Sequence, residues 1–331
     1  MIVWTRRRTK VLGSAVMVII LLSAVGCAQT TAPAGGLDGT TTRSALIFGT
    51  NLSLYDTNDQ VVNNDATQQL LKQTHIPIIR MPFRFSLSDA YETQALQAIK
   101  RVGAVPLVII HGPTDPNALP DDRALIALTQ AVFGDDVVYV EFGNEADLAG
   151  VDVWRYTESW NAVIPSLKVM APTYKFVGPV NFQFDPAYLA TFNRYANPRP
   201  DVNSWHEYVC YPYSSNDYCV DHLADWTAHI RQANEVVRAA IGTTLPIMIT
   251  EWNLDAAPDA RYADGDFMQA WTAQALETLS TAMPLGLMGA IHYCVTNNVH
   301  FALIDASNVP TPQGRTLFRI LARHAAEARS A

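Results

Sequence analysis

Short apolar runs and longer amphipathic stretches alternate along the chain from residue 45 onward. The apolar runs are rich in Val and Ile, and successive runs begin roughly 27 to 44 residues apart, which leaves room for a strand, a loop and a helix each time. Near-continuous hydrophobicity is typical of parallel strands that are covered on both faces. We therefore predict eight strands, at Ala45–Gly49, Ile76–Arg80, Val105–Ile110, Val137–Phe142, Lys175–Val180, Val202–His206, Pro246–Thr250 and Gly289–Tyr293.

The stretches between these runs show the periodicity of helices. In the stretch after the second run, Leu96 and Ile99 fall on one side and Lys100 on the other, and Gly103 is placed to end the helix. Trp154 and Trp160, on the stretch after the fourth run, are expected in the core. The clearest predicted helices are Ala90–Arg101, Asp121–Val132, Asp221–Ile241 and Asp266–Ala282.

Eight strand–helix units in about 280 residues fit an α/β fold with a single (β/α)8 TIM barrel, whose usual size is about 250 residues. The competing α/β fold is an open, doubly wound sheet, which commonly carries a Gly-rich loop after its first strand. Here the first run continues as Phe48-Gly49-Thr50-Asn51, without such a loop. We therefore predict one barrel domain over residues 45–331.

The first 44 residues follow a different pattern. Segment 6–10 contains four basic residues, and residues 11–25 are almost wholly apolar. Positive residues, then apolar residues, then small residues are the order of a secretory signal. The ending Ala24–Cys27 resembles a bacterial lipobox, which implies a lipoprotein signal peptide over residues 1–26 and a lipid on Cys27. The alternatives are an ordinary cleaved signal peptide and an uncleaved anchor helix.

The segment behind this leader is expected to be a flexible tether, residues 27–44, because it is rich in Thr, Ala and Gly. Removal of residues 1–26 takes away four positive charges, so the formal charge changes from -8 to -12. Such an acidic chain is a poor partner for nucleic acid. We expect an exported protein that contacts the membrane only through its N-terminal lipid, outside the cytoplasm. Its oligomeric state is left open.

The other cysteines suggest different states. Cys210 and Cys219 lie nine residues apart in a loop rich in Tyr, Pro, Ser and Asn, and they could form a disulfide in an oxidising compartment. Cys294 lies in an apolar run and is expected to be a buried thiol. The sequence contains no Cys/His cluster with zinc spacing, and we predict no metal and no organic cofactor.

Polar residues follow most of the predicted strands. The active site of a (β/α)8 barrel is built at the C-terminal ends of its strands. A single carboxylate or imidazole in such a place is usually a solvated or structural residue, but a set of them favours a functional site. The set comprises Arg80, His111, Glu141, Asn144, Glu145, Asn181, His206, Glu207, Tyr208, Glu251, Trp252 and His292.

Two elements of this set resemble the signature of clan A glycoside hydrolases, which include families 5, 39 and 51. They are Asn144-Glu145 after the fourth strand and Glu251 after the seventh. His206-x-Tyr208 is similar to the clan's His-x-Tyr, and Arg80 to its active-site arginine. Residues 301–313 resemble the stretch after the eighth strand in family 39-like members.

The resemblance covers residues 45 to about 325 and implies a retaining O-glycoside hydrolase for an extracellular oligo- or polysaccharide. Glu145 would be the acid/base and Glu251 the nucleophile, and such a pair of carboxyl groups lies about 5 to 5.5 Å apart. One position departs from the clan, because Tyr293 and Cys294 stand where a tryptophan is usual at the end of the eighth strand.

Supporting roles follow from the same resemblance. Asn144 would bind the sugar 2-hydroxyl, and His206 would orient Glu145 or raise its pKa. Tyr208 and Arg80 would keep Glu251 ionised. The predicted substrate-binding residues are Arg80, His111, Asn144, Asn181, His206, Tyr208, Trp252 and His292.

Several alternatives stay open. Glu141 and Glu207 compete for the catalytic roles, although strand alternation points Glu207 away from the face used by His206 and Tyr208. The tyrosines around Cys210 and Cys219, at positions 208, 211, 213 and 218, form either a sugar-stacking wall or a loop that packs on the barrel rim. The protein could instead be a solute-binding lipoprotein or a barrel that binds glycans without catalysis.

Overall fold

The computed structural model describes residues 47–330, with side chains over residues 48–326. These residues belong to one compact unit. The predicted signal peptide, the lipid-bearing Cys27, the tether and the start of the first predicted strand lie outside the described residues. The predictions for those segments therefore stay predictions.

The strands form one closed, parallel barrel in sequence order, in which β1 pairs with both β2 and β8. This confirms the predicted (β/α)8 fold, and the strand ends differ from the predicted ones by a few residues. The strands are β1 (Ile47–Asn51), β2 (Ile78–Pro82), β3 (Val105–Ile110), β4 (Tyr139–Phe142), β5 (Lys175–Asn181), β6 (Val202–Tyr208), β7 (Ile247–Asn253) and β8 (Leu287–His292).

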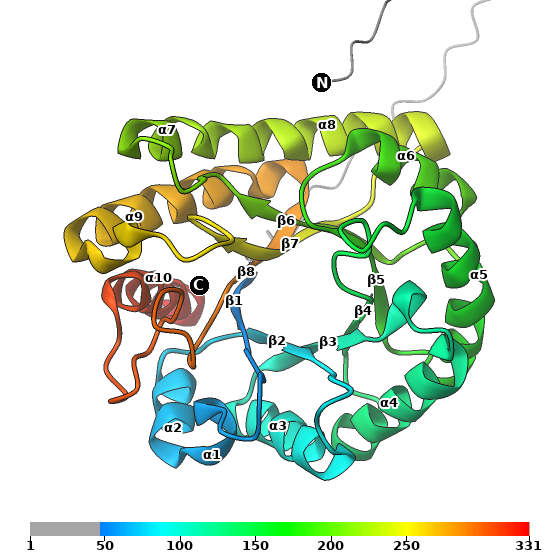
Figure 1. The fold of residues 1–331 in the computed structure, drawn as a ribbon, viewed down its shortest axis with the longest axis horizontal. Helices are drawn as coiled ribbons and strands as arrows, with labels where there is room; N and C mark the ends of the chain where they lie inside the picture. Colours follow the sequence, from blue (N-terminus) through cyan, green and yellow to red (C-terminus); the bar gives the residue numbers. More distant parts are fainter. Residues whose placement is uncertain (1–46, 331) are drawn as a thin grey trace, which may run out of the picture. The chain divides into compact units, whose positions relative to one another are not determined.

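The α-helices surround this barrel as an outer ring (Figure 1). The predicted helix at 221–241 corresponds to the helix at 223–241, and a short helix at 216–221 precedes it, with His222 as the cap residue between the two. No helix in residues 47–330 is long and apolar enough to cross a membrane. The helices are α1 (Gln60–Asn63), α2 (Asp65–Gln73), α3 (Asp89–Val102), α4 (Ala118–Phe133), α5 (Val153–Met170), α6 (Pro186–Tyr195), α7 (Asn216–Asp221), α8 (Leu223–Ile241), α9 (Gly265–Thr281) and α10 (Pro312–Ser330), with 3-10 turns η1 (Gly112–Thr114), η2 (Ala260–Ala263) and η3 (Met283–Leu285).

Local signals explain several helix boundaries. The Ser88 hydroxyl accepts a hydrogen bond from the backbone N–H of Tyr91 at the start of α3. Gly103 ends the same helix with φ +87°, as the sequence predicts. At α5, Asp152 caps the N-terminus by accepting from the N–H groups of Trp154 and Arg155. These caps fix where each helix leaves its loop, and the loops carry the site.

The core consists of two layers. A small cluster contains one buried side chain from each of six strands, and side chains from opposite strands of a closed barrel can meet only inside it. A larger cluster fills the space between strands and helices, where Trp160 is fully buried. The prediction of a core position for Trp154 is wrong, because it is 58% exposed near the start of α5 and packs on the Tyr195 ring. The filled interior closes the barrel beneath its mouth.

Candidate active site

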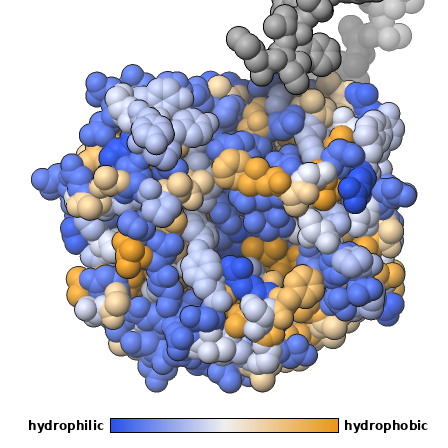
Figure 2. Space-filling model, in the orientation of Figure 1, coloured by the Kyte–Doolittle hydropathy of each residue, from blue (hydrophilic) through white to orange (hydrophobic). Residues whose placement is uncertain are grey.

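A cavity of about 550 Å³ opens at the C-terminal ends of the strands, within the size range of ligand pockets. Figure 2 shows a hollow near the middle of this face, with hydrophilic residues in it and hydrophobic patches along part of its edge. The lining joins loops that are distant in sequence. It includes Asn51, Tyr55, Arg80, Arg84, Phe85, His111, Thr114, Asn144, Glu145, Leu148, Phe182, Tyr208, Glu251, Tyr293 and Phe301.

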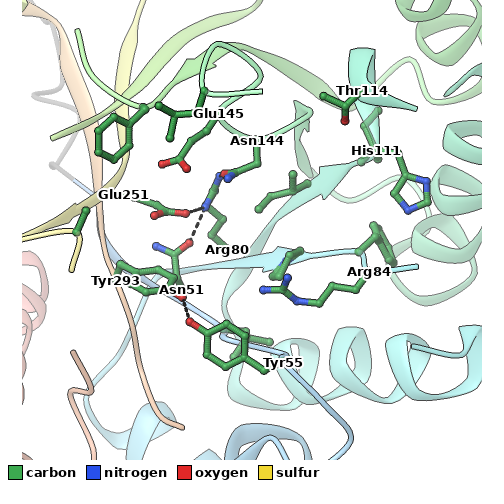
Figure 3. Close-up of a pocket in the computed structure, with 18 of the residues that line it drawn as sticks. Asn51, Tyr55, Arg80, Arg84, His111, Thr114, Asn144, Glu145, Glu251 and Tyr293 are labelled. Atoms are coloured by element: carbon green, nitrogen blue, oxygen red, sulfur yellow. Dashed lines mark hydrogen bonds and ion pairs between the residues drawn. The ribbon is translucent and has the colours of Figure 1, made fainter. Parts of the chain in front are cut away.

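Arg80, on β2, is the hub of the site. It is 1% exposed, and its Nη1 donates to Glu251 Oε1 at 2.5 Å and to Asn51 Oδ1 at 2.9 Å. Its Nη2 donates to Asn144 Oδ1 at 2.6 Å, and its Nε donates to Glu141. Burial acts most strongly on the pKa of Arg80 and lowers it, but the charges and hydrogen bonds of Glu141 and Glu251 together raise this pKa above its usual value. Four side chains are thereby held around one fixed cation. Figure 3 shows three of them, Asn51, Asn144 and Glu251, around Arg80.

Glu251, on β7, lies deep in the pocket with 9% exposure. The Tyr208 hydroxyl donates to its Oε2 at 2.8 Å, while Arg80 holds Oε1. Burial is the largest influence on the pKa of Glu251 and raises it. The charges of His206 and Arg80 and the Tyr208 hydrogen bond together outweigh burial, so this pKa lies below its usual value. Glu251 is therefore an ionised carboxylate at neutral pH.

Glu145 follows β4 on a tight turn. Its backbone has φ +47°, a left-handed conformation that is uncommon for a residue with a side chain, and its N–H donates to Val180 O at 3.0 Å. The turn is supported from β3, because a Cβ on Gly112 would lie 2.5 Å from the backbone nitrogen of Gly143. Strained backbone of this kind is often found at functional sites.

The two glutamates converge on His206. The His206 Nδ1 lies 2.7 Å from Glu145 Oε1 and 3.9 Å from Glu251 Oε2. One oxygen of each carboxyl group and the histidine nitrogen all lie within 4.8 Å of one another. The side chain of Glu145 is 22% exposed and that of Glu251 is 12% exposed. The more accessible carboxyl group is thus Glu145.

His206 itself is fully buried on β6. Burial acts most strongly on its pKa and lowers it, but the charges of Glu251 and Glu145 and the Glu145 hydrogen bond raise the pKa above its usual value. Its Nε2 lies 3.5 Å from Arg80 Nη2, which can only donate. When the ring is neutral, its proton therefore lies on Nδ1 and is donated to Glu145.

The competing carboxylates face elsewhere. Glu141 is fully buried and bound to Arg80, and it does not line the pocket. Glu207 accepts from Trp205 Nε1 at 2.7 Å and pairs with His229 Nδ1 at 2.8 Å, on α8. Its side chain therefore lies between the barrel and the helices, as strand alternation predicts.

The remaining predicted site residues divide into two groups. His111 lines the pocket, with its ring 3.7 Å from that of Phe85, and its Nδ1 lies 3.4 Å from Asp115 Oδ2. Trp252 and His292 are fully buried, and their rings contact each other. His292 also approaches Gln313 on α10, and burial lowers the pKa of His292 to about 3.

Trp252 and His292 therefore belong to the layer between strands and helices, and neither lines the cavity, contrary to the prediction that they bind substrate. Asn181 is 4% exposed and does not line the cavity either, whereas the next residue, Phe182, does. The pairing register of β5 and β6 shifts between Pro179 and Asn181. Such a shift changes which face of the strand a side chain points to.

Sequence reasoning missed several lining residues. Asn51 ends β1, and its amide donates to the backbone carbonyls of Thr250 and His292, each at 3.2 Å. A strand-end asparagine is a readable signal, but the predicted strand stopped at Gly49. Tyr55, Arg84 and Phe301 lie in loops whose paths the pattern does not predict, and the Tyr55 and Tyr293 hydroxyls form a hydrogen bond.

Cys210 and Cys219 form a disulfide in the loop after β6. Arg261 from the β7 loop donates to the carbonyls of Tyr211 and Ser214, both at 2.8 Å. Of the tyrosines proposed as a sugar-stacking wall, Tyr208 lines the cavity, while Tyr211, Tyr213 and Tyr218 do not. The loop is thus fixed on the rim.

The predicted buried thiol, Cys294, is fully buried, and burial raises its pKa to about 12. Among the side chains described, residues 48–326, two groups bring three metal-binding atoms together. One is the pair of glutamates with His206, and the other is His111, Asp115 and Asp121. The prediction of a metal-free site concerns both groups and stays a prediction.

Comparison with protein-family models gives no match for this sequence, and neither does comparison with curated proteins. Solved structures share the barrel. The chain is similar to an alpha-L-arabinofuranosidase from Thermotoga maritima in complex with arabinose, with TM-score 0.65 and 15% identity over 85% of this chain and 70% of that one. It is also similar to a monomeric beta-xylosidase from Caulobacter crescentus CB15, with TM-score 0.62 and 16% identity over 83% and 67%.

A third similar structure is a GH5-4 broad specificity endoglucanase from an uncultured bacterium, with TM-score 0.55 and 13% identity. The alignment covers 86% of this chain and 94% of that chain. These structural similarities show a common fold, and the assignment of catalytic roles depends on the site itself.

Proposed function

We propose that this protein is a retaining glycoside hydrolase with Glu251 as nucleophile and Glu145 as general acid/base. The observation that carries the proposal is the pair of carboxyl groups, which approach within 4.8 Å of each other at the barrel mouth in different environments. The separation suits double displacement, because an inverting enzyme needs about 6.5 to 9.5 Å for its water. The glycosidases that share the fold support the same reading.

The reaction follows from these environments. Glu251 is held ionised and attacks the anomeric carbon, while Glu145 gives its proton to the leaving glycosidic oxygen. A glycosyl ester on Glu251 results. Glu145, now a carboxylate beside His206, takes a proton from water, and that water releases the sugar and restores Glu251. Each glutamate thus returns to its starting protonation state.

Asn144 has a defined part in this scheme. Its Oδ1 accepts from Arg80, which leaves the amide N–H groups to donate. The side chain is exposed at the pocket. It is therefore placed to donate to the hydroxyl next to the anomeric carbon, and such a bond strengthens in the transition state.

The test compares residues 28–331 with Glu251→Ala and Glu145→Ala on a panel of aryl glycosides and polysaccharides. We expect the wild-type protein to hydrolyse a glycoside of this panel and Glu251→Ala to lose that hydrolysis. Azide should restore turnover of Glu251→Ala and give a glycosyl azide of inverted configuration. Glu145→Ala with azide should give the azide of retained configuration. Glu207→Ala serves as a control, since that carboxylate faces α8. A wild-type protein that binds glycans but releases no product would instead support a binding lipoprotein.

We also propose that the protein is exported and anchored by a lipid on Cys27, which the segment 6–27 supports. The lipid would hold the enzyme at the membrane surface while it acts on glycans outside the cytoplasm. Expression of the full chain and of Cys27→Ser in a bacterial host tests this. The anchored chain should sediment with membranes, and Cys27→Ser should not carry a labelled fatty acid.

A further inference from the structure

Arg84 differs from the other charged residues that line the pocket. Arg80 and Glu251 form an ion pair, and Glu145 pairs with His206. Among the side chains described, residues 48–326, no carboxylate forms an ion pair with the Arg84 guanidinium. The protein carries a formal charge of -8, so a cation without an acidic partner at its pocket is unexpected.

One carboxylate contacts Arg84, but at its backbone and not at its guanidinium. Glu92 is 3% exposed on α3, and its Oε1 accepts from the backbone N–H of Arg84 at 2.7 Å. Burial raises the pKa of Glu92 to about 7, so this group is partly neutral at physiological pH. Glu92 therefore fixes the backbone of Arg84 and leaves the positive charge of the side chain free for another partner.

The Arg84 side chain is already ordered. Its Nη2 donates to Ser53 O at 2.8 Å, and its guanidinium carbon lies 5.3 Å from the centre of the Tyr55 ring. Its Nε is buried and has no hydrogen-bond partner in the part of the chain that the structure describes. Figure 3 shows the chain reaching from the β2 side toward Tyr55, on the other side of the pocket from Glu145. Little ordering entropy would be lost when an anion binds here.

We propose that Arg84 binds a carboxylate on the sugar, so that the substrate contains uronic acid. This rests on the proposed function, and it names the substrate class of that same site. A guanidinium suits a carboxylate because its parallel N–H groups match the two oxygens. Tyr55 and Phe85, both more than half exposed beside Arg84, offer ring faces to the sugar.

The charge of Glu251 makes Arg84 necessary for such a substrate. A uronic acid near an ionised nucleophile is repelled, and a neighbouring cation offsets this repulsion. Arg80 is already balanced by Glu141 and Glu251, so Arg84 is the lining cation left for the substrate. The competing explanation is structural, since Arg84 also connects the β2 loop to Ser53 in the β1 loop.

The first experiment uses the wild-type protein and three aryl glycosides with the same leaving group: a hexoside, the matching uronide and its methyl ester. We expect kcat/KM for the free uronide to exceed that for its ester by about 10- to 100-fold, the usual worth of a hydrogen bond to a charged group. Equal values for acid and ester would overturn the proposal. A preference for a sulfated sugar over the uronide would overturn the carboxylate assignment.

Variants then separate charge from structure. In Arg84→Gln, the ratio of uronide to ester turnover should fall about 10- to 100-fold, and Arg84→Lys should lose less. Arg101→Gln, on the outer side of α3, is the control and should keep the wild-type ratio. A purely structural role would lower turnover of acid and ester alike and leave their ratio unchanged.

A binding measurement distinguishes this inference from the proposed function. Calorimetry with Glu145→Gln and acidic oligosaccharides, free and methyl-esterified, reports recognition without turnover. Binding that requires both the free acid and Arg84, with no hydrolysis by the wild type, would support the inference and refute catalysis. Hydrolysis with no distinction between acid and ester would do the reverse.

Discussion

Tyr208→Phe removes one atom from the site and tests whether Glu251 is the nucleophile. The Tyr208 hydroxyl donates to Glu251 Oε2 at 2.8 Å, and both side chains are buried. This hydrogen bond favours the ionised carboxylate. Its loss should therefore raise the pKa of Glu251, while the charge of Arg80 still acts to lower it.

The size of the change follows from the type of bond. A hydrogen bond to a charged group contributes about 1.5 to 3 kcal/mol, and each pKa unit corresponds to about 1.36 kcal/mol. The pKa of Glu251 should then rise by about one to two units in Tyr208→Phe. Below that pKa the nucleophile is protonated, so the acid limb of the pH–rate profile should shift to higher pH by the same amount.

The assay is kcat/KM against pH on an aryl glycoside with a good leaving group, for which protonation by Glu145 matters least. Tyr156→Phe is the matched control, because its hydroxyl is equally buried but donates to the carbonyl of Phe142 at 2.8 Å. An acid limb that stays in place in Tyr208→Phe, or that moves equally in Tyr156→Phe, would refute the role given to Glu251.

Three further predictions concern stability. Arg80→Met leaves the buried Glu141 without its cation and should lower the free energy of unfolding, measured in urea, by about 3 to 5 kcal/mol. A decrease below about 1 kcal/mol would contradict the stabilising role of the buried ion pairs. Replacing Cys210 and Cys219 by Ala opens a short loop and should lower the free energy of unfolding by about 2 to 3 kcal/mol. An unchanged free energy of unfolding under non-reducing conditions would argue against the disulfide. The folded pKa of Glu251 is lowered, so its stabilising contribution is present above the unfolded value of about 4.3 and is lost as the pH falls through the folded pKa. We expect the difference in free energy of unfolding between the wild type and Glu251→Gln to change within that acidic pH window. A difference that does not depend on pH would contradict the lowered pKa of Glu251.

The sequence predicted the barrel because its signals are local. Each strand is a short apolar run and each helix a periodic stretch, so the alternation could be counted without knowing any contact. The parallel order then placed strand ends at one mouth, which is why Arg80, Asn144, Glu145, Tyr208 and Glu251 lie together around the cavity.

Side-chain direction was less predictable. Trp252 directly follows Glu251 on β7, and strand alternation turns its side chain to the opposite face, where it packs among the rings of the helix layer. The substrate-binding prediction for Trp252 relied on its position at the strand end and did not apply this alternation. His292 shares that layer. Register shifts in β5–β6, β6–β7 and β7–β8 also change which residue faces the mouth, and a shift depends on the neighbouring strand.

The sequence alone therefore determined the fold class, the order of the strands and the candidate glutamates, since periodicity and strand-end position are properties of the chain itself. The tertiary structure decided what surrounds those glutamates. It placed His206 between Glu145 and Glu251 and bound Arg80 to residues from three other strands or their loops. Among the described side chains, it gave Arg84 no acidic partner. Such relations join residues far apart in sequence, and only folding brings their atoms within hydrogen-bonding distance.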